Sequence, residues 1–172
     1  SNLNDIKCIK MSQLFDANIQ QWVQFFSEAY KQNPRGIDFD ESIFSENAKN
    51  DLPLFLSICN EILLLQDDNE DLNTAKELSS FFLKKVLNYQ DLDDLKEKRS
   101  IIPSESVEQI KNVLKQNIFS DNPTIRSNCA EIYSLLFSIL TTNWEEGIDD
   151  IVNLFNDSTL LPYGFIILYS IM

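Results

Sequence analysis

Histidine is absent from this chain, and glycine and cysteine each occur only three times. Without histidine, neither a Ser-His-Asp nor a Cys-His nucleophile can be assembled, and the commonest metal ligand is missing. Gly36, Gly147 and Gly164 are too widely spaced to form a phosphate-binding loop or a dinucleotide fingerprint. We therefore expect no enzymatic activity, no cofactor and no bound metal.

Basic residues are also scarce, because 14 Lys and Arg stand against 27 Asp and Glu, which gives a net charge of −13. After Arg126 every charged residue is acidic. Such a chain repels a phosphate backbone, so we expect no nucleic acid as a ligand and instead a basic protein partner. Acidity also serves solubility, and the composition leaves that simpler interpretation open.

The cysteines and the hydrophobic pattern favour a cytosolic or nuclear protein. Cys8, Cys59 and Cys129 lack paired spacing, and the last two fall in apolar stripes, where a free cysteine acts as a small hydrophobe. No run reaches the roughly 18 consecutive apolar residues that a membrane span needs. The start of the chain has no basic stretch followed by an apolar one, so we expect neither a signal peptide nor membrane association.

Apolar residues recur at helical spacing along most of the chain. The pattern predicts helices over residues 11–32, 51–66, 73–87, 103–118, 123–140, 144–156 and 158–172. Asp51 and Asn122, each followed closely by a proline, are typical helix starts. Asn143 is the expected cap of the helix over residues 144–156, whose buried side is predicted to hold Trp144, Ile148, Ile151, Val152 and Phe155. Residues 37–50 are expected to form a long loop with at most one short helical turn, either a docking insertion or a variable loop. Residues 88–102 are expected to form a mixed-charge linker.

Two of these helices open alike, with Asn73-Thr74-Ala75 and with Asn122-Pro123-Thr124. The two threonines lie 50 positions apart, close to the period of HEAT repeats once a long loop is allowed for. We therefore predict an all-α fold, an α-α superhelix (HEAT-like solenoid) of about three helix pairs plus a final helix, in a single segment over residues 1–172. The expected pairs are 11–66, 73–119 and 122–156, and the last helix is 158–172. That last helix is too apolar to face water, which suggests a fragment of a longer solenoid.

Several motifs resemble the N-terminal region of the importin-β (karyopherin-β) family of nuclear transport receptors. Residues 52–56 look like the start of that family's first B helix, 75–87 resemble its second A helix, and 101–118 are similar to its second B helix. The segment Asn143-Trp144-Glu145-Glu146-Gly147-Ile148 resembles the Trp-Pro-Glu-Leu-Ile lead-in of the third B helix, with a changed middle. Lys85 and Ser100 also depart from the Asn and Trp that are usual in the family, although Arg99 matches its Arg-Trp pair.

The resemblance implies a curved stack with A helices outside and B helices inside, whose inner face binds the GTP-bound form of the small GTPase Ran and so controls cargo release. Nucleoporins and cargo or adaptors would bind through regions beyond Met172, in the cytoplasm, the nucleus and the nuclear pore. The residues that helical phase places on the inner face are Ser57, Asn60, Glu61, Glu108, Asn112, Lys115, Glu145, Glu146, Asp149 and Asn153. Their acidic and amide oxygens can accept hydrogen bonds from Lys and Arg of a partner.

Two alternatives remain open. A generic HEAT-like scaffold, such as a phosphatase, tubulin-associated or vesicle-coat subunit, would hold another basic partner whatever its nucleotide state. An enzyme or metal site near Asp149 and Asp150 is disfavoured, because neighbouring acids on a helix point in different directions. Glu146 and Asp150 are four residues apart, but without further converging ligands they would form only a weak, open site.

Overall fold

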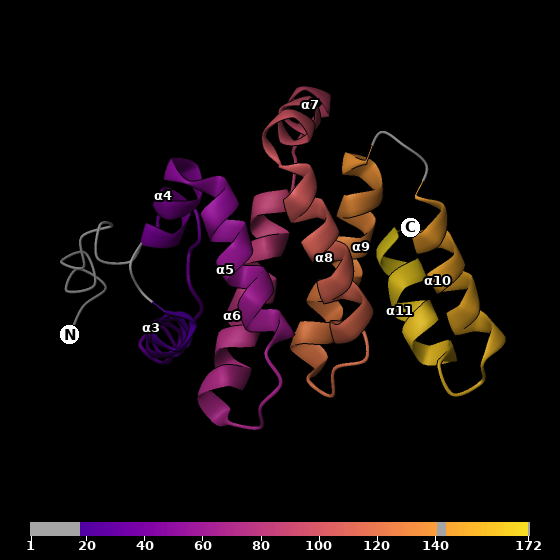
Figure 1. Cartoon of the computed structure of the whole chain (residues 1–172), viewed down its shortest axis with the longest axis horizontal. Helices are drawn as coiled ribbons and strands as arrows, with labels where there is room; N and C mark the ends of the chain where they lie inside the picture. The colour runs from indigo at the N-terminus through magenta and orange to yellow at the C-terminus, as the bar shows by residue number, and fades with distance from the viewer. Residues whose placement is uncertain (1–17, 141–143, 172) are drawn as a thin grey trace. The chain divides into compact units, whose positions relative to one another are not determined.

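The computed structural model describes residues 18–140 and 144–171, and all regular elements of this part are helices (Figure 1). They are α3 (Ile19–Lys31), α4 (Ile43–Asn50), α5 (Leu52–Leu64), α6 (Glu70–Leu87), α7 (Leu92–Ile101), α8 (Ser104–Asn117), α9 (Pro123–Ile139), α10 (Glu145–Asn156) and α11 (Leu161–Ile171). The all-α prediction is confirmed. The chain divides into two compact units, unit 1 over residues 1–85 and unit 2 over residues 86–172.

The helix boundaries follow local capping signals. The Asn18 side chain accepts a hydrogen bond from the Gln21 amide, and the Gln21 side chain accepts one from the Asn18 amide, so α3 begins with a capping box. Asp51 caps α5 through the Leu54 amide, as the sequence predicts. Residues 11–17 of the first predicted helix and the predicted cap Asn143 lie outside the described residues.

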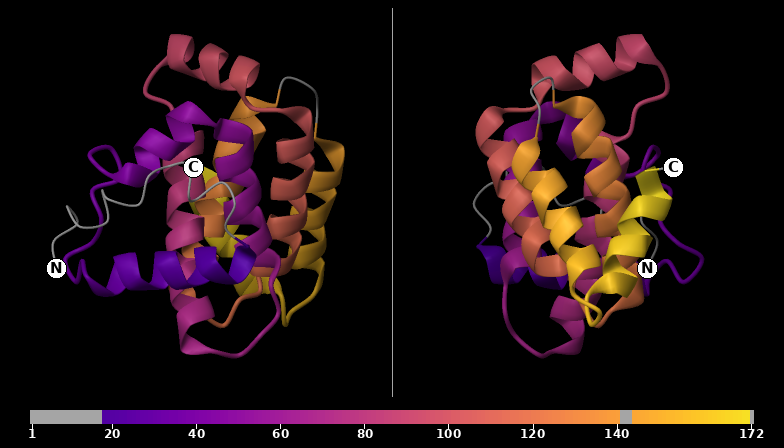
Figure 2. Two further views of the ribbon diagram at one scale, coloured as in Figure 1. Left: turned by 60° about the vertical axis from the view of Figure 1, so that its left-hand side comes forward. Right: turned by 90° about the vertical axis from the view of Figure 1, so that its right-hand side faces the viewer.

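The core of unit 1 is a cluster of aromatic rings from different helices. Phe26 of α3, Phe44 of α4 and Phe82 of α6 contact one another, with the Phe44 and Phe82 centroids 4.4 Å apart. Phe39 and Phe55 also pack on Phe82. Such pairs add to the hydrophobic gain from burying large rings. They hold α3 across α5 rather than alongside it, as the left-hand view of Figure 2 shows.

Two helices were not expected, and each is specified by caps more than by an apolar stripe. The predicted loop over residues 37–50 contains α4, which starts at its N-cap Ser42 and lies against α5. The predicted linker over residues 88–102 contains α7, whose cap Asp91 accepts hydrogen bonds from the amides of Asp93 and Asp94. Only Leu95 of α7 is buried, so hydrophobic periodicity gave no signal there.

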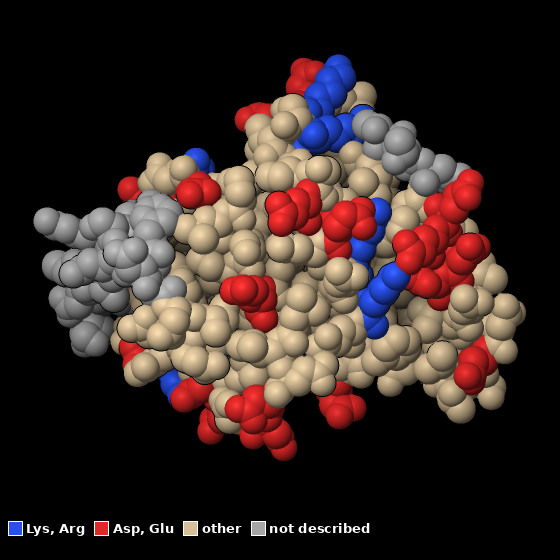
Figure 3. Space-filling view, viewed as in Figure 1, with Lys and Arg blue, Asp and Glu red and all other residues tan. Residues whose placement is uncertain are grey.

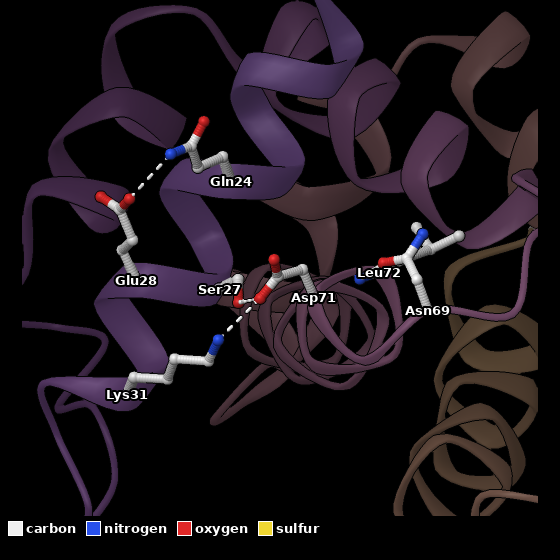
Figure 4. Close-up of polar contacts among 7 residues, drawn as sticks. All are labelled: Gln24, Ser27, Glu28, Lys31, Asn69, Asp71 and Leu72. Carbon is white, nitrogen blue, oxygen red and sulfur yellow. Dashed lines mark hydrogen bonds and ion pairs between the residues drawn. The ribbon is translucent and has the colours of Figure 1, made fainter.

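A polar contact fastens the start of α6 to α3 in unit 1 (Figure 4). The Asp71 carboxylate accepts hydrogen bonds from the Ser27 hydroxyl at 2.8 Å and from the Lys31 ammonium at 2.6 Å. The Lys31 hydrogen bond, followed by that of Ser27, lowers the pKa of Asp71. Ser27 is buried and Lys31 is exposed, so the Asp71 contact lies at the edge of the core.

In unit 2, helix α9 lies against α7, α8 and α11, and α11 also packs against α10. Figure 2 shows α7 lying across the ends of α8 and α9. From α7, Arg99 donates hydrogen bonds through Nε to the Ile139 carbonyl at 3.1 Å and through Nη2 to the Ser138 carbonyl at 2.7 Å. A cation therefore satisfies carbonyls left without partners at the C-terminal end of α9.

Replacing Lys31 by Met should raise the pKa of Asp71 toward the ordinary aspartate value, because the strongest donor to its carboxylate is lost. A carboxyl carbon NMR titration measures this. A lowered native pKa stabilises the fold above the unfolded-state pKa, and this contribution disappears as the pH falls through the native pKa. Lys49→Met, which removes an exposed cation from α4, is the control. An Asp71 pKa that is the same with and without Lys31 would contradict the contact.

Replacing Arg99 by Ala should lower the free energy of unfolding by about 1 kcal/mol, because carbonyls at the end of α9 lose charged donors. Urea unfolding followed by circular dichroism measures the change. Lys96→Ala, on the same helix, removes only an exposed ion pair with Asp93 and should change stability by less than about 0.5 kcal/mol. Equal effects of the two substitutions would show that Arg99 does not hold α9.

Candidate functional site

The ten residues predicted to form a binding face are distributed over both units. Ser57, Asn60 and Glu61 belong to α5 in unit 1. The other seven belong to α8 and α10 in unit 2 and are all exposed: Glu108, Asn112, Lys115, Glu145, Glu146, Asp149 and Asn153. The candidate site in unit 2 is therefore formed by two helices that are separated in sequence by α9.

The three residues that the prediction places on the α5 part of the face differ in exposure. Glu61 is exposed and Ser57 is half-buried, but Asn60 is only 1% exposed, so its place on a binding face is wrong in this structure. Asn60 lies four residues after Leu56 and three before Leu63, which are both fully buried. It shares their side of the helix, because residues three and four apart face the same way. Unit 1 thus offers little of the predicted face.

The exposed residues of α8 and α10, which the Lys115–Glu146 ion pair and a shared cavity link, are together called the α8–α10 face. It comprises Glu108, Asn112 and Lys115 of α8 and Glu145, Glu146, Ile148, Asp149, Val152 and Asn153 of α10. Figure 3 shows acidic side chains gathered over α10 with basic ones beside them. An ion pair between Lys115 and Glu146 joins the two helices.

The bases of α8 are engaged by acids within the face. The hydrogen bond between Lys115 and Glu146 lowers the pKa of Glu146 and raises that of Lys115. Lys111 bonds Glu108 at 2.7 Å, and its ammonium lies 5.8 Å from the centre of the Trp144 ring. Among the described residues, no ion pair involves Glu145 or Asp149. Glu145 and Asp149 therefore leave uncompensated negative charge on the outer side of α10.

Trp144 fixes how α10 sits on unit 2. Its ring is 6% exposed and stacks on Tyr133 of α9, with centroids 5.5 Å apart and planes at 9°. The Phe137 ring of α9 also contacts Trp144, with centroids 4.7 Å apart and planes tilted by 40°. The interpretation of Trp144 as a buried anchor at the start of a helix is confirmed. Its indole Nε1 is buried without an acceptor among the described residues, which costs free energy and is offset by ring packing.

Gly147 lies directly against this ring. A Cβ atom built on Gly147 would stand 2.4 Å from the Trp144 ring, far inside contact distance. The glycine that departs from the importin-β motif therefore has a packing role here, because only a residue without a side chain lets the backbone approach the ring. Leu154 is the other well-buried residue of α10. Gly147 and Leu154 mark the inner side of the helix.

The rotation of α10 differs from the expected one. Ile148 and Val152 were predicted to be buried, but they are 46% and 49% exposed. They alternate along the helix with Glu145 and Asp149, at spacings of three and four residues, so these four side chains form one outward stripe. We call Glu145, Ile148, Asp149 and Val152 the outward stripe. In the sequence, Gly147 is the feature that could have indicated this rotation of α10. A glycine has no side chain and so suits the crowded inner side of the helix.

A cavity of about 250 Å³ opens beside the α8–α10 face. Its lining combines apolar and polar side chains: Lys115, Ile118, Phe119, Tyr133, Asp150, Asn153, Leu154 and Leu160. Burial, and then the Asp150 carboxylate, raise the pKa of Tyr133, so its hydroxyl stays protonated at neutral pH. Sequence periodicity could not identify this cavity, because its walls come from several segments of unit 2.

The described residues contain neither a cluster of candidate metal ligands nor a helix that could span a membrane. Over residues 18–140 and 144–171, no three His, Cys, Asp or Glu side chains converge as metal ligands would. The described helices include none with both the length and the apolar character of a membrane span. Cys59 and Cys129 are buried free thiols, and burial raises the pKa of Cys129 to about 12, which suits the predicted packing role.

Comparison of the chain with protein-family models, with curated proteins and with solved structures finds no match. The importin-β resemblance therefore rests on the sequence motifs alone.

Gly147→Ala should destabilise the protein by at least about 1 kcal/mol, because the new methyl group collides with the Trp144 ring. In an ordinary helix a Gly→Ala substitution raises the free energy of unfolding by about 1 kcal/mol, so a decrease here indicates the collision with the ring. Urea denaturation measures it. In a Trp144→Leu background the clash is relieved and Gly147→Ala should become neutral or stabilising. A stabilising Gly147→Ala in the otherwise unchanged protein would contradict the packing of α10 described above.

Proposed function

We propose that this chain is a helical protein-binding module that takes a basic partner on the α8–α10 face. The observation that supports the proposal is the outward stripe, where two exposed aliphatic side chains alternate with two acids on one helix. Exposed aliphatic residues lose contact with water on binding, which favours association. Acids free of ion pairs attract a basic surface and select against an acidic one.

The geometry of the face favours binding over catalysis. The Glu108 and Glu146 carboxylates are already engaged by Lys111 and Lys115, so these acids set the shape of the face. Glu145 and Asp149 project from a helix anchored by Trp144, which limits the ordering cost on binding. A partner with Lys or Arg beside apolar residues would match this arrangement.

The specific partner that we propose is the GTP-bound form of Ran, and the support for it is the resemblance to importin-β receptors in residues 52–56, 75–87, 101–118 and 143–148. In this proposal the chain acts in nucleocytoplasmic transport, in the cytoplasm and nucleus, and Ran docking releases cargo. A generic HEAT-like scaffold would use the same face for another basic protein, without dependence on nucleotide state.

Isothermal titration calorimetry of the chain with Ran, loaded with a non-hydrolysable GTP analogue or with GDP, tests the specific partner. We expect binding of the GTP form only. The double substitution Glu145→Lys and Asp149→Lys should weaken binding at least tenfold, because it reverses both unpaired charges of the outward stripe.

The control for that variant is Glu97→Lys with Asp121→Lys, which changes the net charge equally at exposed positions outside the face. This control variant should bind the GTP form of Ran with an affinity within threefold of that of the unchanged chain. Equal binding of the GTP and GDP forms would contradict Ran-GTP as the specific partner and favour the generic scaffold. Equal loss in the two double variants would remove the α8–α10 face as the binding surface and leave only a general charge effect.

A further inference from the structure

The cavity beside the α8–α10 face has the size and lining of a pocket for one side chain. Its volume of about 250 Å³ lies below the roughly 300–1,000 Å³ of common small-molecule sites. Ile118, Leu154 and Leu160 supply aliphatic walls, and Phe119 and Tyr133 supply aromatic ones. An occupant with an apolar stem would therefore gain from leaving water.

One wall of this cavity carries a polar group that lacks a partner. The Asp150 Oδ2 atom is buried, and no group of the described residues donates a hydrogen bond to it. A buried acceptor without a donor costs free energy, which a donor brought by a ligand would recover. Lys115 also lines the cavity, but its ammonium is bonded to Glu146. The group in this cavity that can still accept a hydrogen bond is therefore the Asp150 carboxylate.

We propose that this cavity binds an arginine side chain of a protein partner, with the guanidinium donating to Asp150 and the methylene stem lying against Ile118, Leu154 and Leu160. The inference rests on the proposed function, because it names the residue of the basic partner that the face holds. The charge of the helix supports this occupant, since α10, which supplies Asp150, also carries Glu145, Glu146 and Asp149 and so attracts a cation over a longer range.

Arginine suits the lining better than lysine does. The planar guanidinium stacks on aromatic rings, here Phe119 and Tyr133, whereas an ammonium acts as a point charge. The guanidinium is also more weakly hydrated, so it enters an apolar cavity at a lower desolvation cost. A neutral side chain of the same shape would fill the space but would bring no charge to the Asp150 carboxylate.

NMR titration of the whole ¹⁵N-labelled chain tests the pocket without any protein partner. The probes are N-acetyl-arginine methylamide, the corresponding lysine compound and the neutral citrulline compound. Arginine should give saturable shifts at Phe119, Asp150 and Leu154, with lysine and citrulline at least fivefold weaker. Equal binding of citrulline, or shifts confined to residues outside the cavity, would overturn the proposal.

Two variants locate the site. Asp150→Asn should weaken arginine binding at least fivefold, whereas Asp121→Asn, at an exposed position of the same unit outside the α8–α10 face, should stay within twofold. Leu160→Trp keeps the carboxylate but fills the cavity, and it should abolish the shifts even if Asp150→Asn alters folding. Arginine binding that survives Leu160→Trp would place the ligand elsewhere and refute the pocket.

The test also separates this inference from the proposed function. If arginine does not bind but the charge reversal at Glu145 and Asp149 still weakens a basic protein partner, the pocket is refuted and the binding module stands. If arginine binds in the cavity but no basic protein binds the face, the proposed function fails and the pocket remains.

Discussion

The contact of the Trp144 ring with Tyr133, Phe137 and Gly147 is the constraint on which the candidate site depends. The stack on Tyr133 fixes the depth of the first turn of α10, and the bare backbone of Gly147 fixes its rotation. Once Gly147 faces the ring, a helix of 3.6 residues per turn must direct Glu145, Asp149 and Val152 outward. Ring packing stabilises this arrangement, since the Trp144 ring stacks on Tyr133 and contacts Phe137.

That rotation also divides the charges of the α8–α10 face into two sets. Glu146 forms an ion pair with Lys115 of α8, while Glu145 and Asp149 lie on the outward stripe and form no ion pair with other described residues. The inner set joins two helices that lie on either side of α9 in sequence, and the outer set remains available to a partner. A difference of one residue in helical phase thus separates structural acids from candidate binding acids, although their side chains are chemically alike.

Unit 1 is organised by aromatic packing of a different kind. Phe82 of α6 contacts rings from α3, α4 and α5, together with Phe39 before α4, so one side chain gathers the core. The short helix α4 carries few apolar residues, yet Phe44 is 1% exposed because the surrounding rings enclose it. Tertiary contacts here stabilise a helix that periodicity alone would not support. The polar contact of Asp71 with Ser27 and Lys31 then sets where α6 begins relative to α3.

The amino-acid sequence by itself determined that the chain is helical, where α5 and α9 begin, and that Trp144 is buried, because caps and apolar spacing act within a few residues. It also placed Glu145, Glu146, Asp149 and Asn153 on an exposed side of α10, since helical phase is local. Only the tertiary structure decided that Ile148 and Val152 are exposed, that Asn60 is buried, that residues 92–101 form α7, and that Asp150 lines a cavity. These outcomes depend on which neighbour covers each face of a helix, and such contacts join residues far apart in the chain.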